Sequence, residues 1–366
     1  MIGGAVTMSV HTEHTATPLY FDEIRERVLT RLTTFLTGKR DAAAGRGLVP
    51  EIPEMIRGFV TAGGKRLRPM LCSAGWRSAG GAGLPDVVVD VAAALEMYQT
   101  FALIHDDVID GSATRRSQPT VHRSIAARYP QVYDERRFGE AAAILIGDMA
   151  LMWSTELLTS AALPAGCRSA VRALVDTMRE EMHYGQYLDL FTSLGSVDDH
   201  RTPMTVIRYK TAKYTVERPL QLGALLAGAD AAHLDLLSRF ALPLGDAFQL
   251  RDDLLGLFGN SSTTGKPVFD DLREGKHTVL LALAAQRADT AGRALLERHL
   301  GDPALTEQDA IRVMDVIEGT RAPVIVEDMI ADRHAEALAV LDTSSLPAEV
   351  TAELRLIGAL LVERDS

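Results

Sequence analysis

Residues 101–110 read Phe101-Ala102-Leu103-Ile104-His105-Asp106-Asp107-Val108-Ile109-Asp110, so an apolar run ends in three carboxylates. The preceding segment, 87–100, contains no proline or glycine and is apolar on nearly every face, which predicts a buried helix. Asp106 and Asp110 lie one helical turn apart and share a face, whereas Asp107 points about 100° away. Because buried carboxylates without partners are costly, this end of the helix is expected to line a wet or metal-filled cavity.

Carboxylates at this spacing suit Mg²⁺, which binds one or two carboxylates together with substrate phosphates and water. An isolated motif of this kind would be better explained as a helix that surfaces and turns polar. Here a second acidic pair, Asp252-Asp253, lies on another apolar helix, and Arg115 and Arg116 follow the first motif closely. These two features favour a site for metal ions and phosphates.

The composition bounds the class of protein. The chain has 38 Lys and Arg against 49 Asp and Glu, a net charge of -11, which makes non-specific nucleic-acid binding improbable. Cys72 and Cys167 lack metal-type spacing and are expected to be reduced core residues of a cytoplasmic protein. We expect no signal peptide and no stable membrane insertion, a disordered segment over 1–18 and one all-α domain over 19–366.

Helical periodicity dominates the chain, and no segment shows the alternation of a β-strand. Helices are predicted over 19–35, 51–60, 87–110, 141–159, 167–190 and 233–258, with further helices to the C-terminus. The segment 260–276 is expected to be a polar loop. Within it, Asp271 and Lys276 are interpreted as solvated surface charges.

Taken together, the motifs resemble those of the trans-isoprenyl diphosphate synthases, the polyprenyl synthetase family, and are most similar to bacterial geranylgeranyl diphosphate synthases. The resemblance covers about 63–276 and depends on the order of the motifs: Gly63-Gly64-Lys65-Arg66-Leu67-Arg68-Pro69, Asp106-Asp107-Val108-Ile109-Asp110, Arg115-Arg116, Pro119-Thr120-Val121-His122, Gly185-Gln186, Lys210-Thr211, Gly245-Asp246-Ala247-Phe248-Gln249, Asp252-Asp253 and Thr264-Gly265-Lys266. Each piece alone is modest evidence, but the complete set in this order is specific.

The resemblance implies an all-α isoprenoid-synthase bundle around a central substrate cavity, and a homodimer. The implied reaction joins isopentenyl diphosphate head-to-tail to an allylic diphosphate. Three Mg²⁺ ions per active site would be held by Asp106, Asp110 and Asp252, with Asp107 and Asp253 as outer-shell acceptors.

The resemblance also assigns the basic and polar residues. The leaving diphosphate would be bound by Arg115, Lys210 and Lys266, and isopentenyl diphosphate by Lys65, Arg68, Arg116 and Gln99. Thr211 and Gln249 would present oxygen dipoles to the carbocation.

The second acidic motif departs from the family pattern, because Gly256 stands where a third Asp is usual. We expect this loss to be tolerated, since the main metal contact falls on Asp252. Two alternatives remain: a class I terpene cyclase, and a non-catalytic partner subunit of a heteromeric synthase. A cyclase would not need a second set of basic residues, and partner subunits usually lose an acidic motif.

Product length is expected to depend on the helix that precedes Asp106. Phe101 lies about one turn deeper than Asp106 and Tyr98 about one turn deeper again, whereas Ala102 is small. One aromatic side chain that closes the end of the product cavity, without an insertion in the first acidic motif, is a pattern that resembles the geranylgeranyl synthases. The sequence therefore predicts a twenty-carbon product, with farnesyl diphosphate as the alternative.

Overall fold

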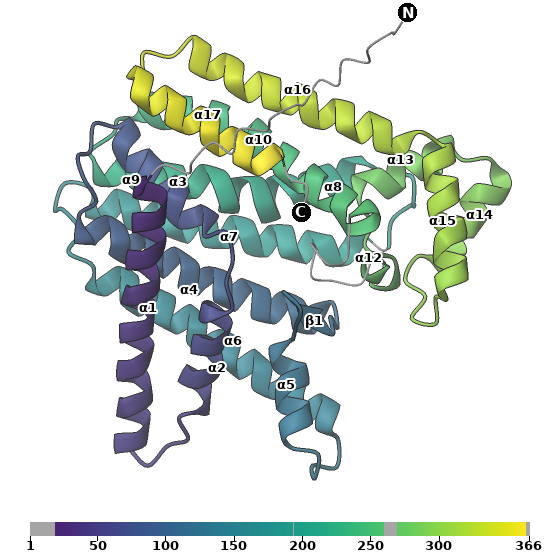
Figure 1. Cartoon of the computed structure of the whole chain (residues 1–366), viewed down its shortest axis with the longest axis horizontal. Helices are drawn as coiled ribbons and strands as arrows, with labels where there is room; N and C mark the ends of the chain where they lie inside the picture. The colour runs from purple at the N-terminus through teal and green to yellow at the C-terminus, as the bar shows by residue number, and fades with distance from the viewer. Residues whose placement is uncertain (1–18, 193, 260–268, 364–366) are drawn as a thin grey trace, which may run out of the picture.

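The computed structural model describes residues 19–192, 194–259 and 269–363 (Figure 1). The N-terminal half contains α1 (Leu19–Gly45), α2 (Glu51–Thr61), α3 (Leu67–Ser78), α4 (Asp86–Ile109), α5 (Val121–Arg128), α6 (Glu135–Ser160) and α7 (Arg168–Thr192). The rest contains α8 (Arg201–Val206), the π-helix η1 (Ile207–Glu217), α9 (Arg218–Leu226), α10 (Ala231–Phe258), α12 (Asp270–Arg273), α13 (Val279–Arg287), α14 (Thr290–His299), α15 (Glu307–Gly319), α16 (Ala322–Asp342) and α17 (Ala348–Val362). The predicted all-α class is confirmed; the segment 1–18 lies outside the described residues.

Helix α4 is the buried helix that the sequence predicts. It packs against α6, α3 and α1, and its buried side chains extend from Val88 to Asp107. By length and composition α4 and α6 could each cross a membrane, which the sequence analysis did not anticipate, with 72% and 44% of the apolar window buried. A core helix passes the same test, and α4 is a core helix.

The basic turn after α4 contains the one strand pair among the described residues, where the sequence analysis expected none. Strands β1 (Thr114–Arg115) and β2 (Gln118–Pro119) pair antiparallel through a two-residue turn. Both turn residues, Arg116 and Ser117, have positive φ angles, 53° and 58°. Such a turn favours glycine, so Arg116 and Ser117 adopt a backbone conformation that residues with a Cβ take up less readily.

The segment from residue 201 onward contains two elements, α8 followed by η1, and η1 carries Lys210 and Thr211. Glycines let its neighbours approach closely. A Cβ on Gly185 of α7 would lie 2.4 Å from the backbone N of Lys210, and one on Gly245 of α10 would lie 2.5 Å from Cα of Ala212. Any side chain at Gly185 or Gly245 would therefore move η1 out of place.

Helix α10 carries the second acidic motif and is covered by the C-terminal helices. It packs against η1 on one side and against α16 and α17 on another; Figure 1 shows these two yellow-green and yellow helices together. Pro243 lies inside α10, yet the helix is continuous from Ala231 to Phe258. The first acidic motif thus lies on α4, in the N-terminal half of the chain, and the second lies on α10, in the C-terminal half.

Candidate active site

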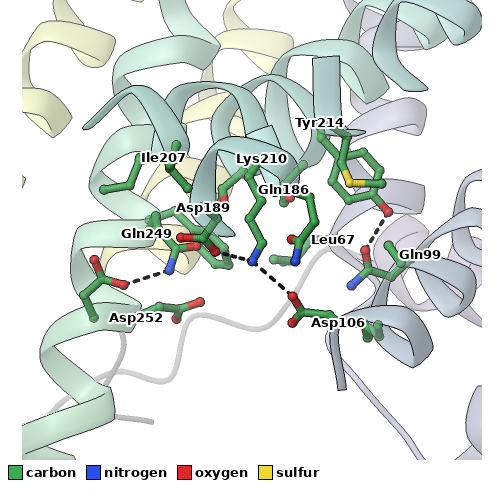
Figure 2. Close-up of a pocket in the computed structure, with 18 of the residues that line it drawn as sticks. Leu67, Gln99, Asp106, Gln186, Asp189, Ile207, Lys210, Tyr214, Gln249 and Asp252 are labelled. Carbon is green, nitrogen blue, oxygen red and sulfur yellow. Dashed lines mark hydrogen bonds and ion pairs between the residues drawn. The ribbon is translucent and has the colours of Figure 1, made fainter. Parts of the chain in front are cut away.

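A cavity of about 850 Å³ lies between α3, α4, α7, η1 and α10 (Figure 2). Its lining contains most of the candidate residues: Lys65, Arg68, Gln99, Phe101, Ala102, Asp106, Arg115, Arg116, Lys210, Thr211, Gln249, Asp252 and Asp253. Three candidates lie beside it, Asp107, Asp110 and Tyr98, and Lys266 lies outside the described residues. Residues from Ala62 to Thr278, far apart in sequence, therefore line one cavity.

Asp106 lies at the cavity end of α4 and is surrounded by cations. Lys210 Nζ is 3.0 Å from its Oδ1 and Arg115 Nη2 is 3.4 Å from its Oδ2. Burial alone would raise the pKa of Asp106, but the charges of Lys210, Arg115 and Lys276 hold it well below its usual range. Asp106 is therefore ionised at neutral pH.

Asp107 and Asp110 differ in their surroundings. Asp107 is buried and accepts a hydrogen bond from Arg115 Nε at 2.7 Å, which fixes the guanidinium beside Asp106. Burial, and then repulsion from Asp106, raise the pKa of Asp110 to about 6. Lys276 Nζ lies 3.5 Å from Asp110 Oδ2. The positive charge of Lys276 therefore offsets part of the negative charge at this end of α4.

Lys210 connects η1 to both α4 and α7. Its Nζ donates to Asp106 and, at 2.8 Å, to Asp189 of α7; Figure 2 shows the two contacts as dashed lines. Burial would lower the pKa of Lys210, but the two carboxylates raise it overall. The sequence analysis did not assign Asp189, although its position one turn after Gly185 on α7 was a usable signal.

The acidic end of α10 is held by a chain of polar contacts. Thr211 Oγ1 donates to Gln249 Oε1 and Gln249 Nε2 donates to Asp253 Oδ1, both at 2.9 Å. Burial is the largest cause that raises the pKa of Asp253 to about 8, and the negative charges of Asp271 and Asp252 add to it. Asp253 is thus protonated in a large share of molecules at neutral pH unless a cation binds nearby.

Asp271 and Lys276 are not solvated surface charges, so that interpretation is wrong. Both line the cavity, and the exposed fractions of their side chains are 18% and 31%. Lys276 Nζ lies 3.5 Å from Asp271 and 3.0 Å from Glu274. A backbone hydrogen bond from Lys276 N to Asp271 O also closes the turn after α12, from which both side chains reach the cavity.

A second set of basic residues lies near the start of α3. Arg68 Nη2 donates to Thr215 Oγ1 at 2.6 Å, and its guanidinium lies 4.3 Å from the centroid of the Tyr214 ring. Tyr214 OH donates to Gln99 Oε1 at 2.6 Å, so these residues orient one another (Figure 2). They form a polar wall distinct from the one around Asp106.

Arg116 lies over the paired glycines that precede α3. It donates to the backbone oxygen of Gly63, and a Cβ on Gly64 would lie 2.8 Å from Arg116 Nη2. Gly64 also has a φ of 126°, which only glycine adopts readily. Lys65 lies beside this contact and also lines the cavity. Glycine at position 64 therefore allows Arg116 to lie against this turn, and Lys65, Arg68 and Arg116 all line the cavity.

Aromatic rings from α4 and α7 form part of the apolar lining of the cavity. Phe101 stacks on His183 of α7, with ring centroids 5.6 Å apart and an angle of 24° between the planes, and contacts Tyr98 at 5.3 Å. Tyr98 is 1% exposed and lines a second, much smaller void of about 10 Å³. The sequence analysis found the two aromatic residues of α4 but not His183, which has no motif of its own.

The polyprenyl synthetase family model matches residues 49–317. A geranylfarnesyl diphosphate synthase from Aeropyrum pernix is 32% identical over 84% of this chain and 92% of its own length. A farnesyl diphosphate synthase from Mycobacterium bovis is 30% identical over 83% of this chain and 80% of its own. Among solved structures, the fold is similar to that of geranylgeranyl pyrophosphate synthase from Corynebacterium glutamicum, complexed with isoprenyl diphosphate and magnesium. The TM-score is 0.89 and the sequence identity is 39%, over 94% of this chain and 99% of that chain.

Proposed function

The chain belongs to the polyprenyl synthetase family and is a trans-prenyltransferase, and we propose that it extends allylic diphosphates with isopentenyl diphosphate to geranylgeranyl diphosphate. One observation supports two diphosphate substrates: the cavity has two separate cationic walls. Arg115, Lys210 and Lys276 contact the carboxylates at the end of α4. Lys65, Arg68 and Arg116 line the cavity near the start of α3, where Arg68 contacts Thr215 and Arg116 contacts Gly63. A cyclase that acts on a single diphosphate would not need both.

The residues at the acidic ends of α4 and α10 suit Mg²⁺, on which the family depends. Among the described residues no three His, Cys, Asp or Glu side chains are grouped closely enough to hold a metal ion together. However, the available donors are carboxylate oxygens, which Mg²⁺ prefers. Burial is the main cause that raises the pKa values of Asp110 and Asp253, neighbouring carboxylates raise them further, and a bound cation would favour the ionised form of both. We propose that Asp106, Asp110 and Asp252 hold three ions together with the substrate diphosphate.

When bound, Mg²⁺ neutralises the charge that develops on the leaving diphosphate. The protein residues bind and orient the substrates. Lys210 lies between Asp106 and Asp189 and can donate to a diphosphate placed at that point, and Arg115 presents a forked guanidinium fixed by Asp107. Thr211 Oγ1 donates to Gln249 Oε1 and both residues line the cavity, which supports the proposal that their oxygen atoms face the allylic carbocation.

The two cationic walls predict separate effects on the two substrates. Arg68→Ala is expected to raise KM for isopentenyl diphosphate, and Lys210→Ala the KM for the allylic diphosphate, each about 10- to 100-fold, because each removes a charge-assisted hydrogen bond. Steady-state kinetics with one substrate varied at a time measures this, with the exposed Arg239→Ala as control. Equal effects of both variants on both substrates would contradict the assignment.

We also propose that the chain is a homodimer that pairs through α6. Phe138, Leu145 and Met152 recur every seven residues and are 39%, 62% and 55% exposed, so they form an apolar stripe on one face. The cytoplasmic location expected from the sequence remains a prediction.

Light scattering during size exclusion tests the dimer. The native chain is expected at about twice its mass of 39.7 kDa, and Leu145→Glu with Met152→Glu at the mass of one chain, because the charges would be buried in the interface. Leu48→Glu, at a residue 59% exposed outside α6, is the control and should remain dimeric. A native chain that is monomeric at micromolar concentration would rule out the proposal.

A further inference from the structure

The π-helix η1 forms part of the cavity wall, and a cluster of charged side chains outside the cavity is attached to it. We propose that Glu181 of α7, by binding Lys213 and Arg218 together, holds the end of η1 in its π-helical form and so positions the residues that bind isopentenyl diphosphate. The inference rests on the proposed function, because it concerns how one of the two diphosphate substrates is held.

The residues that η1 presents to the cavity require a wide helical turn. π-Helical segments are rare and usually one turn long, whereas η1 spans 11 residues. Its cavity-lining residues recur every four positions, at Ile207, Thr211 and Thr215 and again at Lys210 and Tyr214. In an α-helix, each interval of four would rotate the side chain by about 40° away from the starting direction. The wider turn of the π-helix keeps these residues on one wall.

Lys213 and Arg218 form the last π-helical turn of η1. The backbone N–H of Arg218 donates to the carbonyl oxygen of Lys213, five residues earlier, which is the hydrogen bond of a π-helix. Residues five apart therefore lie one above the other on a π-helix, whereas an α-helix would turn them about 140° apart. A single carboxylate that binds both side chains thus favours the π-helix over the α-helix.

Glu181 is that carboxylate. Its Oε1 accepts hydrogen bonds from Lys213 Nζ at 2.8 Å and Arg218 Nη2 at 2.7 Å, and its Oε2 accepts one from Arg218 Nε at 2.8 Å. The exposed fractions of the three side chains lie between 11% and 17%. Burial alone would raise the pKa of Glu181, but the hydrogen bonds from Arg218 and Lys213 lower it overall, so Glu181 is ionised at neutral pH. Forked, charge-assisted contacts of this kind are strong and directional.

The two residues that follow Lys213 hold the basic side chain near the start of α3. The Arg68 guanidinium lies 4.3 Å from the centroid of the Tyr214 ring, and Arg68 Nη2 donates to Thr215 Oγ1 at 2.6 Å. Tyr214 OH donates to Gln99 Oε1 at 2.6 Å. Rewinding of this turn as an α-helix would rotate Tyr214 and Thr215, and Arg68 would lose both contacts. Glu181 is therefore a positioning residue that acts on Arg68 through η1.

The start of η1 has a separate attachment to α7. Glu181, Gly185 and Asp189 lie four residues apart on one face of α7. Gly185 permits the close approach of the Lys210 backbone, and Asp189 accepts a hydrogen bond from the Lys210 side chain. Loss of the Glu181 contacts would therefore release the end of η1 while Lys210 stays in place. The loss is expected to affect isopentenyl diphosphate more than the allylic diphosphate.

Steady-state kinetics with one substrate varied at a time tests this difference. Glu181→Gln keeps the shape of the side chain and removes its charge. It is expected to raise KM for isopentenyl diphosphate about 10-fold or more, and KM for the allylic diphosphate by about threefold at most. Asp90→Asn is the matched control, because Asp90 is 17% exposed against 16% for Glu181 and binds Arg31 at 2.6 Å, which joins α4 to α1. Both KM values of Asp90→Asn should stay near native.

A double-mutant cycle with Arg68→Ala separates positioning from general stability. If Glu181 acts through Arg68, Glu181→Gln with Arg68→Ala should have a KM for isopentenyl diphosphate within about twofold of Arg68→Ala alone. Two independent effects would multiply instead. Multiplied effects, equal changes in both KM values, or native kinetics in a folded Glu181→Gln enzyme would overturn the proposal.

Hydrogen exchange tests the winding of η1 without turnover. The backbone amides of 214–218 are expected to exchange at least about 10-fold faster in Glu181→Gln than in the native protein, and at the native rate in Asp90→Asn. Arg218→Lys keeps the positive charge and removes the fork, so it is the second variant if Glu181→Gln does not fold, with the same expected difference between the two substrates. Native exchange rates in the folded variants would contradict the role of Glu181.

The proposed function is tested separately by the native protein with Mg²⁺ and both substrates. Absence of a prenyl product there would reject the function. Native kinetics and native exchange rates in the Glu181 and Arg218 variants would reject only the positioning role of Glu181.

Discussion

Asp106→Ala and Asp252→Ala are each expected to lower turnover by at least about 10²- to 10³-fold while the fold persists. Asp106 is the carboxylate that Lys210 and Arg115 both face, and its pKa is held low, so it is the permanently charged acid of α4. Asp252 lies across the cavity on α10. Removing either would leave the charge on the leaving diphosphate uncompensated at one end.

Turnover is measured with isopentenyl diphosphate and an allylic starter at saturating Mg²⁺, and folding by circular dichroism and thermal melting. Each helix offers a matched control. Asp86→Ala changes an acid that is 96% exposed at the start of α4, and Asp235→Ala one that is 69% exposed on α10. Near-native turnover in a folded Asp106→Ala or Asp252→Ala enzyme would contradict the metal assignment and favour a different site.

Replacement of Phe101 by alanine is expected to lengthen the product beyond twenty carbons. Phe101 and His183 both line the cavity and stack on each other, and Tyr98, one helical turn before Phe101, contacts the Phe101 ring. Removing the Phe101 ring would deepen the cavity, and Tyr98 would become the next barrier. Chain-length analysis of the extracted products, after removal of the diphosphate, measures the change.

Variants of neighbouring residues distinguish a floor from general loosening of the core. Tyr98→Ala alone should leave product length unchanged because Phe101 still closes the cavity, whereas Phe101→Ala with Tyr98→Ala should lengthen the product further. Phe101 is 5% exposed, and a buried Phe→Ala change typically costs about 3–5 kcal/mol of stability. Phe101→Leu is therefore a milder second variant, and unchanged products in both folded variants would reject Phe101 as the floor.

The product cannot be read from similarity alone. Relatives that make fifteen- and twenty-five-carbon products, by their names, are 30% and 32% identical to this chain, and the 39% identical structure is a geranylgeranyl synthase. Identity thus varies little while the product changes. The size of the floor formed by Phe101 and His183 is a local property, which is why we use it for the proposal.

The sequence by itself determined the helical class, the central helix α4 and the residues around the cavity that carry motifs. These are local properties: an unbroken apolar run predicts a buried helix, and one-turn spacing predicts that Asp106 and Asp110 share a face. The chemistry of diphosphate binding could be inferred in the same way, because the charged residue types and their order along the chain limit what they can bind.

Only the tertiary structure decided which distant residues meet. Asp189 meets Lys210 because Gly185 lets η1 approach α7, and His183 meets Phe101 because α7 packs across the end of the cavity. Asp271 looked like a loop charge in sequence, yet it lies against Gly256. The physical reason is that side-chain periodicity reports which face of its own helix a residue occupies, whereas the distance between two helices is set by the volumes packed between them.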